Sequence, residues 1–153
     1  MNIFFVSTDP GEAAAMLCDK HIGKMLIESA QLMSTAWHSV GRPVGYKPTH
    51  QNHPCAVWTR LSDKHYAWVL EHAKELGAEW RRRFVKQHAT EVYVLQQLDL
   101  AFPGNGAWIQ PPQCMPEEFR QSSTVEAYRH YYRNKSLSMV MKWSDPATAP
   151  SWF

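Results

Sequence analysis

The stretch SDKHYAWVLEHAKELGAEWRRRF, residues 62–84, contains the clearest helical pattern in the chain. Its apolar residues recur at helical spacing and form one stripe: Tyr66, Val69, Ala73, Leu76, Trp80 and Phe84. Ser62 and Asp63 are residue types that cap the start of a helix. The charged residues of the other side are expected to face solvent: Lys64, Glu71, Glu75, Glu79 and Arg82. The stretch therefore predicts a long amphipathic helix packed on a core.

Helix signals also precede this stretch. Pro10 follows a run of capping residues, which predicts a helix from near residue 10 that ends before Gly41. Gly23 is either a tolerated weak point in this helix or a break between two helices. A loop is expected from about residue 41 to 52, and Pro54 then opens a further helical segment. The first residues, MNIFFV, form an apolar run that indicates a buried strand or an extended arm.

Further helix signals follow residue 84. A helix is expected from about residue 89 to 100, and the proline-containing run at 108–116 is expected to be extended. The last helix should begin at residues 122–124 and present a core stripe: Val125, Tyr128, Tyr132, Met139, Val140 and Trp143. The sequence thus predicts an all-α fold, a single compact domain over residues 1–153 with about four to six helices. A short N-terminal strand is optional, and the Pro-rich C-terminal tail should pack back on the body.

The composition favours one globular domain in a reducing compartment. The chain has 153 residues, of which 44% are hydrophobic and 20% are charged, and no apolar run is long enough for a membrane span. The three cysteines cannot all pair within one chain, and the N-terminus has no basic region of a signal peptide, so a cytoplasmic location is expected. A net charge of +2 alone does not indicate nucleic-acid binding, but basic groups beside aromatic residues suit phosphate contact and base stacking. The oligomeric state stays open.

A second stretch, CDKHIGKMLIESAQ at residues 18–31, carries the residues most suited to chemistry. If it is helical, its apolar residues share a broad side: Ile22, Met25, Leu26, Ala30 and Met33. Its polar residues form a narrow stripe: Lys20, His21, Lys24, Glu28 and Gln31. Two ammonium groups, an imidazole and a carboxylate on one stripe are able to bind an anion and move a proton. The alternative is that the stripe is the solvated side of an ordinary amphipathic helix.

The last helix offers partners for this stripe. Arg129 lies at the edge of its apolar face, so the guanidinium is either paired internally or faces a pocket shared with the stripe. In the second case Lys20, Lys24 and Arg129 would hold a phosphate. His21 with Asp19 or Glu28 would supply proton transfer. Lys24, beside another lysine, is also a candidate nucleophile that forms a Schiff base with a sugar carbon. The remaining candidates for substrate contact are Gln31, His53, Tyr128 and Tyr132.

Two other chemistries were considered from the residue spacing. Cys18-x2-His21 and His50-x2-His53 have the spacing of zinc-ligand pairs, and Cys55 is close to the second pair. Cysteine and histidine also permit nucleophilic hydrolysis, but no evident oxyanion hole accompanies them. Glycine-rich phosphate loops are absent, which argues against nucleoside-triphosphate and dinucleotide sites. No cofactor is expected.

Several runs resemble known families. The run CDKHIGKM, with ESAQ after it, is similar to small proteins of unknown function encoded by tailed bacteriophages, as are NHPCAVW at 52–58, MPEE at 115–118 and AYRHYY at 127–132. The chain also resembles the phage pyrimidine-dimer DNA glycosylases of the endonuclease V type, small all-α enzymes that cut the glycosidic bond and then the strand. Lys20 and Lys24 have the spacing of two DNA-binding arginines of those enzymes, and PEEFR at 116–120 and PSWF at 150–153 have counterparts in the same order.

The glycosylase resemblance implies a shared fold, with two departures at the site. The catalytic glutamate of that family falls at His21, so Asp19 and Glu28 are the carboxylates available to replace it. The family's nucleophile is an N-terminal amine exposed after methionine removal, whereas the large Asn2 is expected to leave Met1 in place.

Three functions follow as hypotheses. The first is a phage-type enzyme of the host-cell cytoplasm that acts on DNA or nucleotides, as an N-glycosylase or lyase at the base or sugar. The second is a non-catalytic anti-defence protein that sequesters a nucleotide or blocks a host factor. The third is a zinc-binding helical protein.

Overall fold

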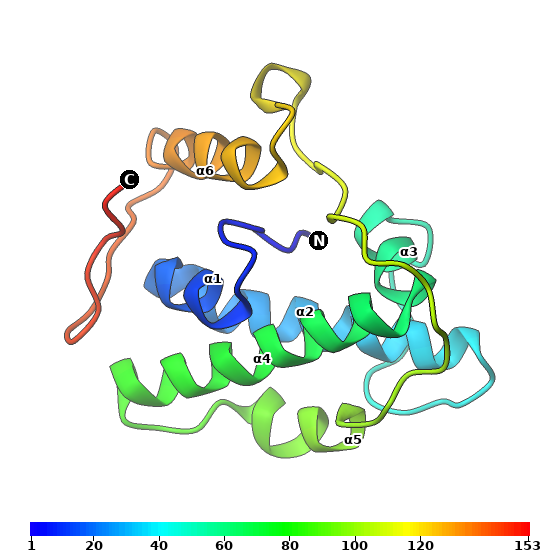
Figure 1. Ribbon diagram of the computed structural model, residues 1–153. Helices are drawn as coiled ribbons and strands as arrows, with labels where there is room; N and C mark the ends of the chain where they lie inside the picture. The colour runs from blue at the N-terminus through cyan, green and yellow to red at the C-terminus, as the bar shows by residue number, and fades with distance from the viewer.

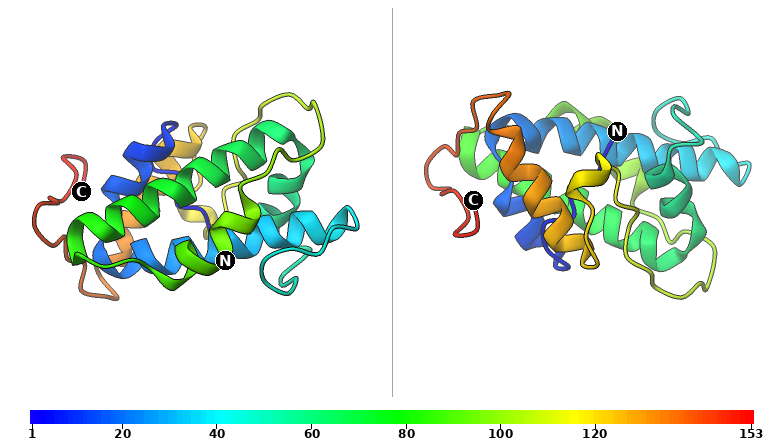
Figure 2. Two further views of the ribbon diagram at one scale, coloured as in Figure 1. Left: turned by 90° about the horizontal axis from the view of Figure 1, so that it is seen from below. Right: turned by 90° about the horizontal axis from the view of Figure 1, so that it is seen from above.

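Two long helices form the base of the structure, a computed structural model that describes residues 1–153. Helices α2 (Asp19–Ser39) and α4 (Asp63–Phe84) lie side by side and run in opposite directions (Figures 1 and 2). Helix α1 (Pro10–Met16) packs against α4, and α3 (Pro54–Leu61) packs against both long helices. The other elements are the π-helical turn η1 (Glu91–Leu95), α5 (Gln96–Leu98), the 3-10 turn η2 (Glu117–Phe119) and α6 (Thr124–Lys135). The all-α fold class is confirmed, and none of these helices has both the length and the apolar character needed to cross a membrane.

The expected capping residues set the helix starts. Asp9 Oδ1 accepts the Glu12 N–H at 2.8 Å, with Pro10 in the first turn of α1. Ser62 Oγ accepts the Lys64 N–H at 3.1 Å and begins α4. Each bond satisfies a backbone donor that the first helical turn leaves unpaired.

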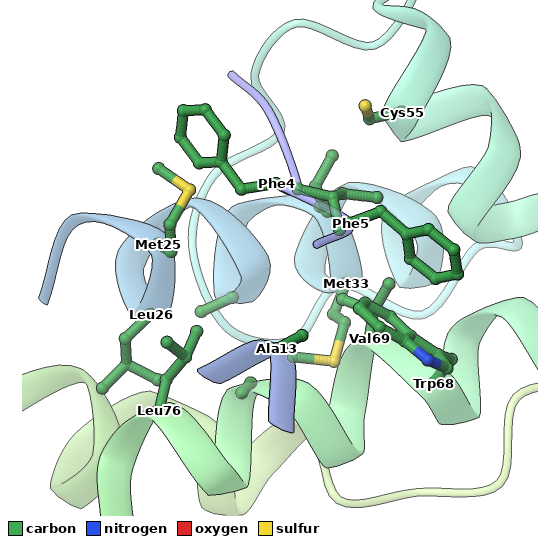
Figure 3. Packing of buried hydrophobic residues seen from close by; sticks show 14 of the residues in the cluster. Phe4, Phe5, Ala13, Met25, Leu26, Met33, Cys55, Trp68, Val69 and Leu76 are labelled. Carbon is green, nitrogen blue, oxygen red and sulfur yellow. The ribbon is translucent and has the colours of Figure 1, made fainter. Parts of the chain in front are cut away.

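The N-terminal segment is a buried, extended arm, and the optional strand does not form. The arm lies between α2 and α6 (Figure 1). The Phe4 ring lies 4.9 Å from that of His21 on α2 and 5.2 Å from that of Tyr132 on α6, whereas Phe5 packs 5.0 Å from Trp68. Figure 3 shows these two phenylalanines pointing to opposite sides of the arm, with Phe5 directed toward Trp68. The arm is therefore part of the core.

The break in the first helical region lies at residues 17–18, between α1 and α2, and not at Gly23. Gly23 sits inside α2, where a Cβ atom would come within 2.7 Å of the Trp80 ring of α4. The glycine is thus required by the close approach of the two long helices, which periodicity within one segment does not reveal.

The last helix is shorter than predicted. It ends at Lys135, so Met139, Val140 and Trp143 do not continue its stripe, and Val140 is 78% exposed. The chain instead returns to α2, where the Asp19 N–H donates to the Lys142 carbonyl oxygen at 2.8 Å. Trp143 Nε1 donates to the Met16 carbonyl oxygen at 3.0 Å. These long-range bonds to the ends of α1 and α2 replace the expected helical turns. The tail does pack back, with Trp152 Nε1 3.4 Å from the Met16 sulfur.

One residue expected to face solvent is buried. Glu79 is 7% exposed, because Arg83 turns inward beside it and donates to its Oε1 at 2.5 Å. Arg83 also reaches the end of α1, where it donates to the Leu17 and Ala15 carbonyl oxygens. Two charged residues of α4, Glu79 and Arg83, therefore form an internal ion pair, and Arg83 also hydrogen-bonds to the end of α1.

Acid is expected to destabilise the fold through His72, which is fully buried on α4. Its Nδ1 lies 3.0 Å from the Pro10 carbonyl oxygen, and burial lowers its pKa to about 4. An unfolded histidine titrates near pH 6.5, so between pH 6.5 and 4 the unfolded chain binds a proton that the native chain does not. Stability therefore falls as pH falls through this window, by about 2 kcal/mol at pH 5.

Urea unfolding at pH 7 and pH 5 measures this loss. A His72→Phe variant lacks the titrating group, so its free energy of unfolding should fall by about 2 kcal/mol less between the two pH values. The same pH dependence in both proteins would contradict the role given to His72.

Candidate functional site

An amine and a carboxylate meet where the N-terminal arm crosses α2. The α-amino nitrogen of Met1 lies 4.0 Å from Glu28 Oε2, and the Asn2 N–H donates to the same oxygen at 2.9 Å. Lys24, one helical turn before Glu28, places its Nζ 3.8 Å from Oε1. The Glu28 side chain is only 15% exposed, whereas that of Lys24 is 64% exposed. The carboxylate thus has an amine beside each of its two oxygens.

The Asn2 side chain holds the start of the arm in this place. Its Oδ1 accepts the Ile3 N–H at 2.7 Å, and its Nδ2 donates to the Cys114 carbonyl oxygen at 2.9 Å. Phe4 adopts a positive φ of 52°, which bends the backbone between the amine and the buried core. The α-amine is therefore presented by an anchored segment and not by a free terminus.

A cavity of about 250 Å³ surrounds the pair. It is lined from the arm, α2, the segment before η2, and α6: Met1, Asn2, Phe4, Lys24, Met25, Glu28, Cys114, Tyr131 and Lys135. Lys135 Nζ lies 4.8 Å from the centre of the Tyr131 ring and 5.5 Å from that of Phe4. Three amines and two aromatic rings thus gather around one carboxylate, an arrangement suited to a phosphate-bearing, base-containing ligand.

The last helix contributes to this cavity through residues other than Arg129. Arg129 Nε donates to the Val6 carbonyl oxygen at 2.9 Å, and its guanidinium lies over the Trp152 ring. Its Nη1 pairs with Glu126 at 3.3 Å. Arg129 is therefore paired internally, the first of the two alternatives for it, and Lys135 is the cation of α6 that faces Lys24 across the cavity.

His21 is buried next to the cavity and contacts residues of the arm and of α6. It is 5% exposed, with Nδ1 2.8 Å from the Tyr132 hydroxyl and its ring against Phe4. Burial, with the nearby charge of Lys135, lowers its pKa to about 4, so the imidazole is neutral at pH 7. It does not line the cavity. Its contacts orient Phe4 and Tyr132.

Asp19 is committed to structural contacts. Its carboxylate accepts from the Ser144 N–H at 3.0 Å, the Ser144 hydroxyl at 2.7 Å and Arg83 at 3.1 Å. Burial alone would raise the pKa of Asp19, but the hydrogen bonds from Ser144 and Arg83 hold it below the usual value. Of the two carboxylates considered from the sequence, Glu28 is the one in the cavity.

The two tyrosines of α6 named from the sequence are buried. The Tyr128 hydroxyl donates to the Pro112 carbonyl oxygen at 2.8 Å, and the Tyr132 hydroxyl accepts the Cys18 N–H at 2.9 Å. Neither ring is open to a ligand, whereas the half-buried Tyr131 between them lines the cavity.

The remaining candidates are dispersed. Lys20 is exposed and Gln31 half-buried, and neither lines the cavity. The four zinc-ligand candidates Cys18, His21, His50 and His53 do not form one cluster. Cys18 lies beside His21, with 3.4 Å between Sγ and Nδ1, whereas the exposed His50 binds the Thr49 hydroxyl. His53 instead gathers with two cysteines, with the ligand atoms within 4.8 Å of one another: His53, Cys55 and Cys114.

Tyr131 was among the tyrosines that the sequence offered for base stacking, but the sequence did not indicate that the Met1 amine, Asn2 and Lys135 line one cavity with Lys24 and Glu28. The available signal was the apolar run that follows Asn2, because a buried arm carries its own terminus toward the core.

The family comparison covers the first part of the chain. Residues 1–92 match the family model described as pyrimidine dimer DNA glycosylase, more than half of the 153 residues. The matched range includes the α-amine, Lys24 and Glu28 but not Tyr131 or Lys135. No curated protein and no solved structure matches the chain.

Proposed function

The chain belongs to the pyrimidine dimer DNA glycosylase family, and from that premise we propose that it is a DNA glycosylase and lyase whose active site is the cavity around Glu28. The observation that carries the proposal is the α-amine of Met1 at 4.0 Å from the Glu28 carboxylate. An amine nucleophile beside a carboxylate is suited to displacement of a base from a sugar through a covalent Schiff base.

In the proposed reaction the neutral α-amine attacks C1′ of the damaged nucleotide. The C1′–N bond of the base breaks, and the base leaves with a proton. The new C1′–N bond becomes a Schiff base as the sugar ring opens and its oxygen takes a proton. Removal of a C2′ proton then expels the 3′ phosphate and cuts the strand. Glu28 stabilises the positive charge that develops at C1′ and accepts the proton that the attacking amine loses.

The cavity offers two other amines, and geometry ranks the α-amine first. Its nitrogen belongs to a segment that the Asn2 side chain anchors through the Cys114 carbonyl oxygen. It also lies 4.0 Å from Glu28 Oε2, on a residue whose side chain is 2% exposed, whereas the Lys24 side chain is 64% exposed. Lys24 and Lys135 are assigned to phosphate contact, and Tyr131 and Phe4 to contact with the sugar or base.

Borohydride trapping tests this proposal directly. When the protein is mixed with DNA that contains an abasic site or a pyrimidine dimer, we expect a covalent protein–DNA adduct, because borohydride reduces the Schiff base. Peptide mapping by mass spectrometry should place the adduct on the α-amine of the first peptide.

A chain extended by several residues before Met1 is the control, because the extension moves the α-amine out of the cavity and should abolish the adduct. An adduct on Lys24 or Lys135 would assign the nucleophile to a side chain instead. No adduct and no strand cleavage with either DNA would reject the enzymatic function.

A further inference from the structure

A histidine and two cysteines, the residue types that bind transition metals, lie next to the cavity around Glu28. We propose that His53, Cys55 and Cys114 bind one thiophilic divalent cation, of which Zn²⁺ is the representative. Cys55 Sγ and Cys114 Sγ are 3.5 Å apart, and the ligand atoms of all three residues lie within 4.8 Å of one another. None of the three cysteines of the chain is in a disulfide.

The spacing of these atoms fits a tetrahedral metal ion. Zn–S bonds of about 2.3 Å and a Zn–N bond of about 2.1 Å at tetrahedral angles place two sulfurs about 3.8 Å apart and a sulfur and a nitrogen about 3.6 Å apart. The observed sulfur separation of 3.5 Å is within a few tenths of an ångström of this value. The distances from the histidine nitrogen to the sulfurs extend to 4.8 Å, so the His53 side chain must turn toward the two sulfurs to complete the ligand set.

The ligand types select the metal. Two thiolates and an imidazole suit Zn²⁺ and its chemical relatives and do not suit Mg²⁺ or Ca²⁺, which prefer oxygen. The two thiolates also neutralise the cation, which matters because Arg120 lines the adjoining pocket and the Met1 amine is nearby. A site of neutral ligands would leave two uncompensated positive charges in this surrounding.

The three residues come from two distant parts of the chain. His53 caps α3 and Cys55 lies in its first turn, whereas Cys114 follows 59 residues later in the extended segment before η2. His53 Nδ1 now accepts the Cys55 N–H at 3.2 Å, a long bond that the metal would replace. His53 and Cys114 also line a pocket of about 680 Å³, which leaves room for a water molecule as fourth ligand.

The metal would link the extended segment before η2 to α3. Because the Cys114 carbonyl oxygen accepts a hydrogen bond from the Asn2 side chain, this link would also hold in place the N-terminal segment whose α-amine lies beside Glu28. The metal site itself does not rest on the proposed glycosylase activity.

Cobalt titration of the reduced, chelator-treated full chain tests the site. We expect one equivalent of Co²⁺ to bind, with a thiolate-to-cobalt charge-transfer band and the visible bands of a tetrahedral site, and excess Zn²⁺ to bleach them. Zn²⁺ should also raise the melting temperature by several degrees, because it binds the folded state alone.

Variants identify the ligands. Cys114→Ser should lower the intensity of the charge-transfer band by at least about half, because only the Cys55 thiolate remains, and both Cys114→Ser and His53→Ala should weaken binding by more than about tenfold, since even indirect supports of metal ligands cost 10- to 100-fold. Cys18→Ala is the matched control, because Cys18 is the third cysteine and stands apart from the site. Cys55 is fully buried, so Cys114, which is only half-buried, is the decisive position should a Cys55 variant fail to fold. Absence of the band in the reduced protein, or a band of undiminished intensity and affinity in Cys114→Ser, would overturn the proposal.

Discussion

Replacement of Glu28 by glutamine is expected to lower the rate of base removal by about 10²- to 10⁴-fold, the range over which a positioned proton-transfer group contributes. Glutamine has the shape of glutamate, and its amide oxygen still accepts the Asn2 N–H, so the arm should stay in place. It carries no negative charge and cannot take the proton of the attacking amine. The charge that develops at C1′ then lacks its nearest counter-charge.

Single-turnover cleavage of lesion-containing DNA measures this loss. Glu71→Gln is the matched control, because Glu71 is an exposed residue of α4, outside the cavity, and its rate should stay within about twofold of the unmodified protein. Both variants should melt within a few degrees of the unmodified chain. A Glu28→Gln rate close to that of Glu71→Gln would show that this carboxylate takes no part in the reaction.

The polar stripe of α2 was visible in the sequence, but the division of roles within it was not. Helical periodicity placed Lys24 and Glu28 on one face, and they do line the cavity together. It placed His21 on the same stripe, although the arm and α6 bury that residue. A period of 3.6 describes one helix in isolation, and the segments that cover a face come from elsewhere in the chain.

The same limit applies to the choice between Asp19 and Glu28 and to the length of the last helix, because both depend on contacts between distant parts of the chain. Asp19 and Glu28 were equivalent candidates until α4 supplied Arg83 to one and the arm supplied an amine to the other. The last helix was expected to continue past residue 135 because its apolar residues keep helical spacing. Instead Trp143 donates to the Met16 carbonyl oxygen at the end of α1 and the Lys142 carbonyl oxygen accepts the Asp19 N–H at the start of α2, and tertiary contacts of this kind leave no periodic signal.

Arg83→Met is expected to lower the free energy of unfolding by about 3 to 5 kcal/mol, the cost of removing one partner from a buried ion pair. The Arg83 side chain is 0% exposed. It donates to Glu79 Oε1 at 2.5 Å and Asp19 Oδ1 at 3.1 Å, and it closes the end of α1 through the Leu17 and Ala15 carbonyl oxygens, both at 2.8 Å. Methionine fills the space but removes one donor from each of these four acceptors, and only Glu79 Oε1, through Arg82, and Asp19 Oδ1, through the Ser144 N–H, keep another side-chain or long-range donor.

Urea unfolding compares this variant with Arg82→Met, the adjacent arginine, which also binds Glu79 but has a side chain that is 44% exposed. The control should cost less than about 1 kcal/mol, because an exposed ion pair is screened by solvent.

The same two variants also test whether a loss of base removal comes only from a loss of stability. Arg83 joins α1, α2 and α4 at the start of the helix that carries Lys24 and Glu28. Local unfolding at the start of α2 should lower the rate of base removal by Arg83→Met in proportion to the unfolded fraction. The rate relative to that of the unmodified protein should therefore recover at low temperature or with a stabilising osmolyte. Equal losses of stability in the two variants would mean that the buried guanidinium contributes no more than its exposed neighbour.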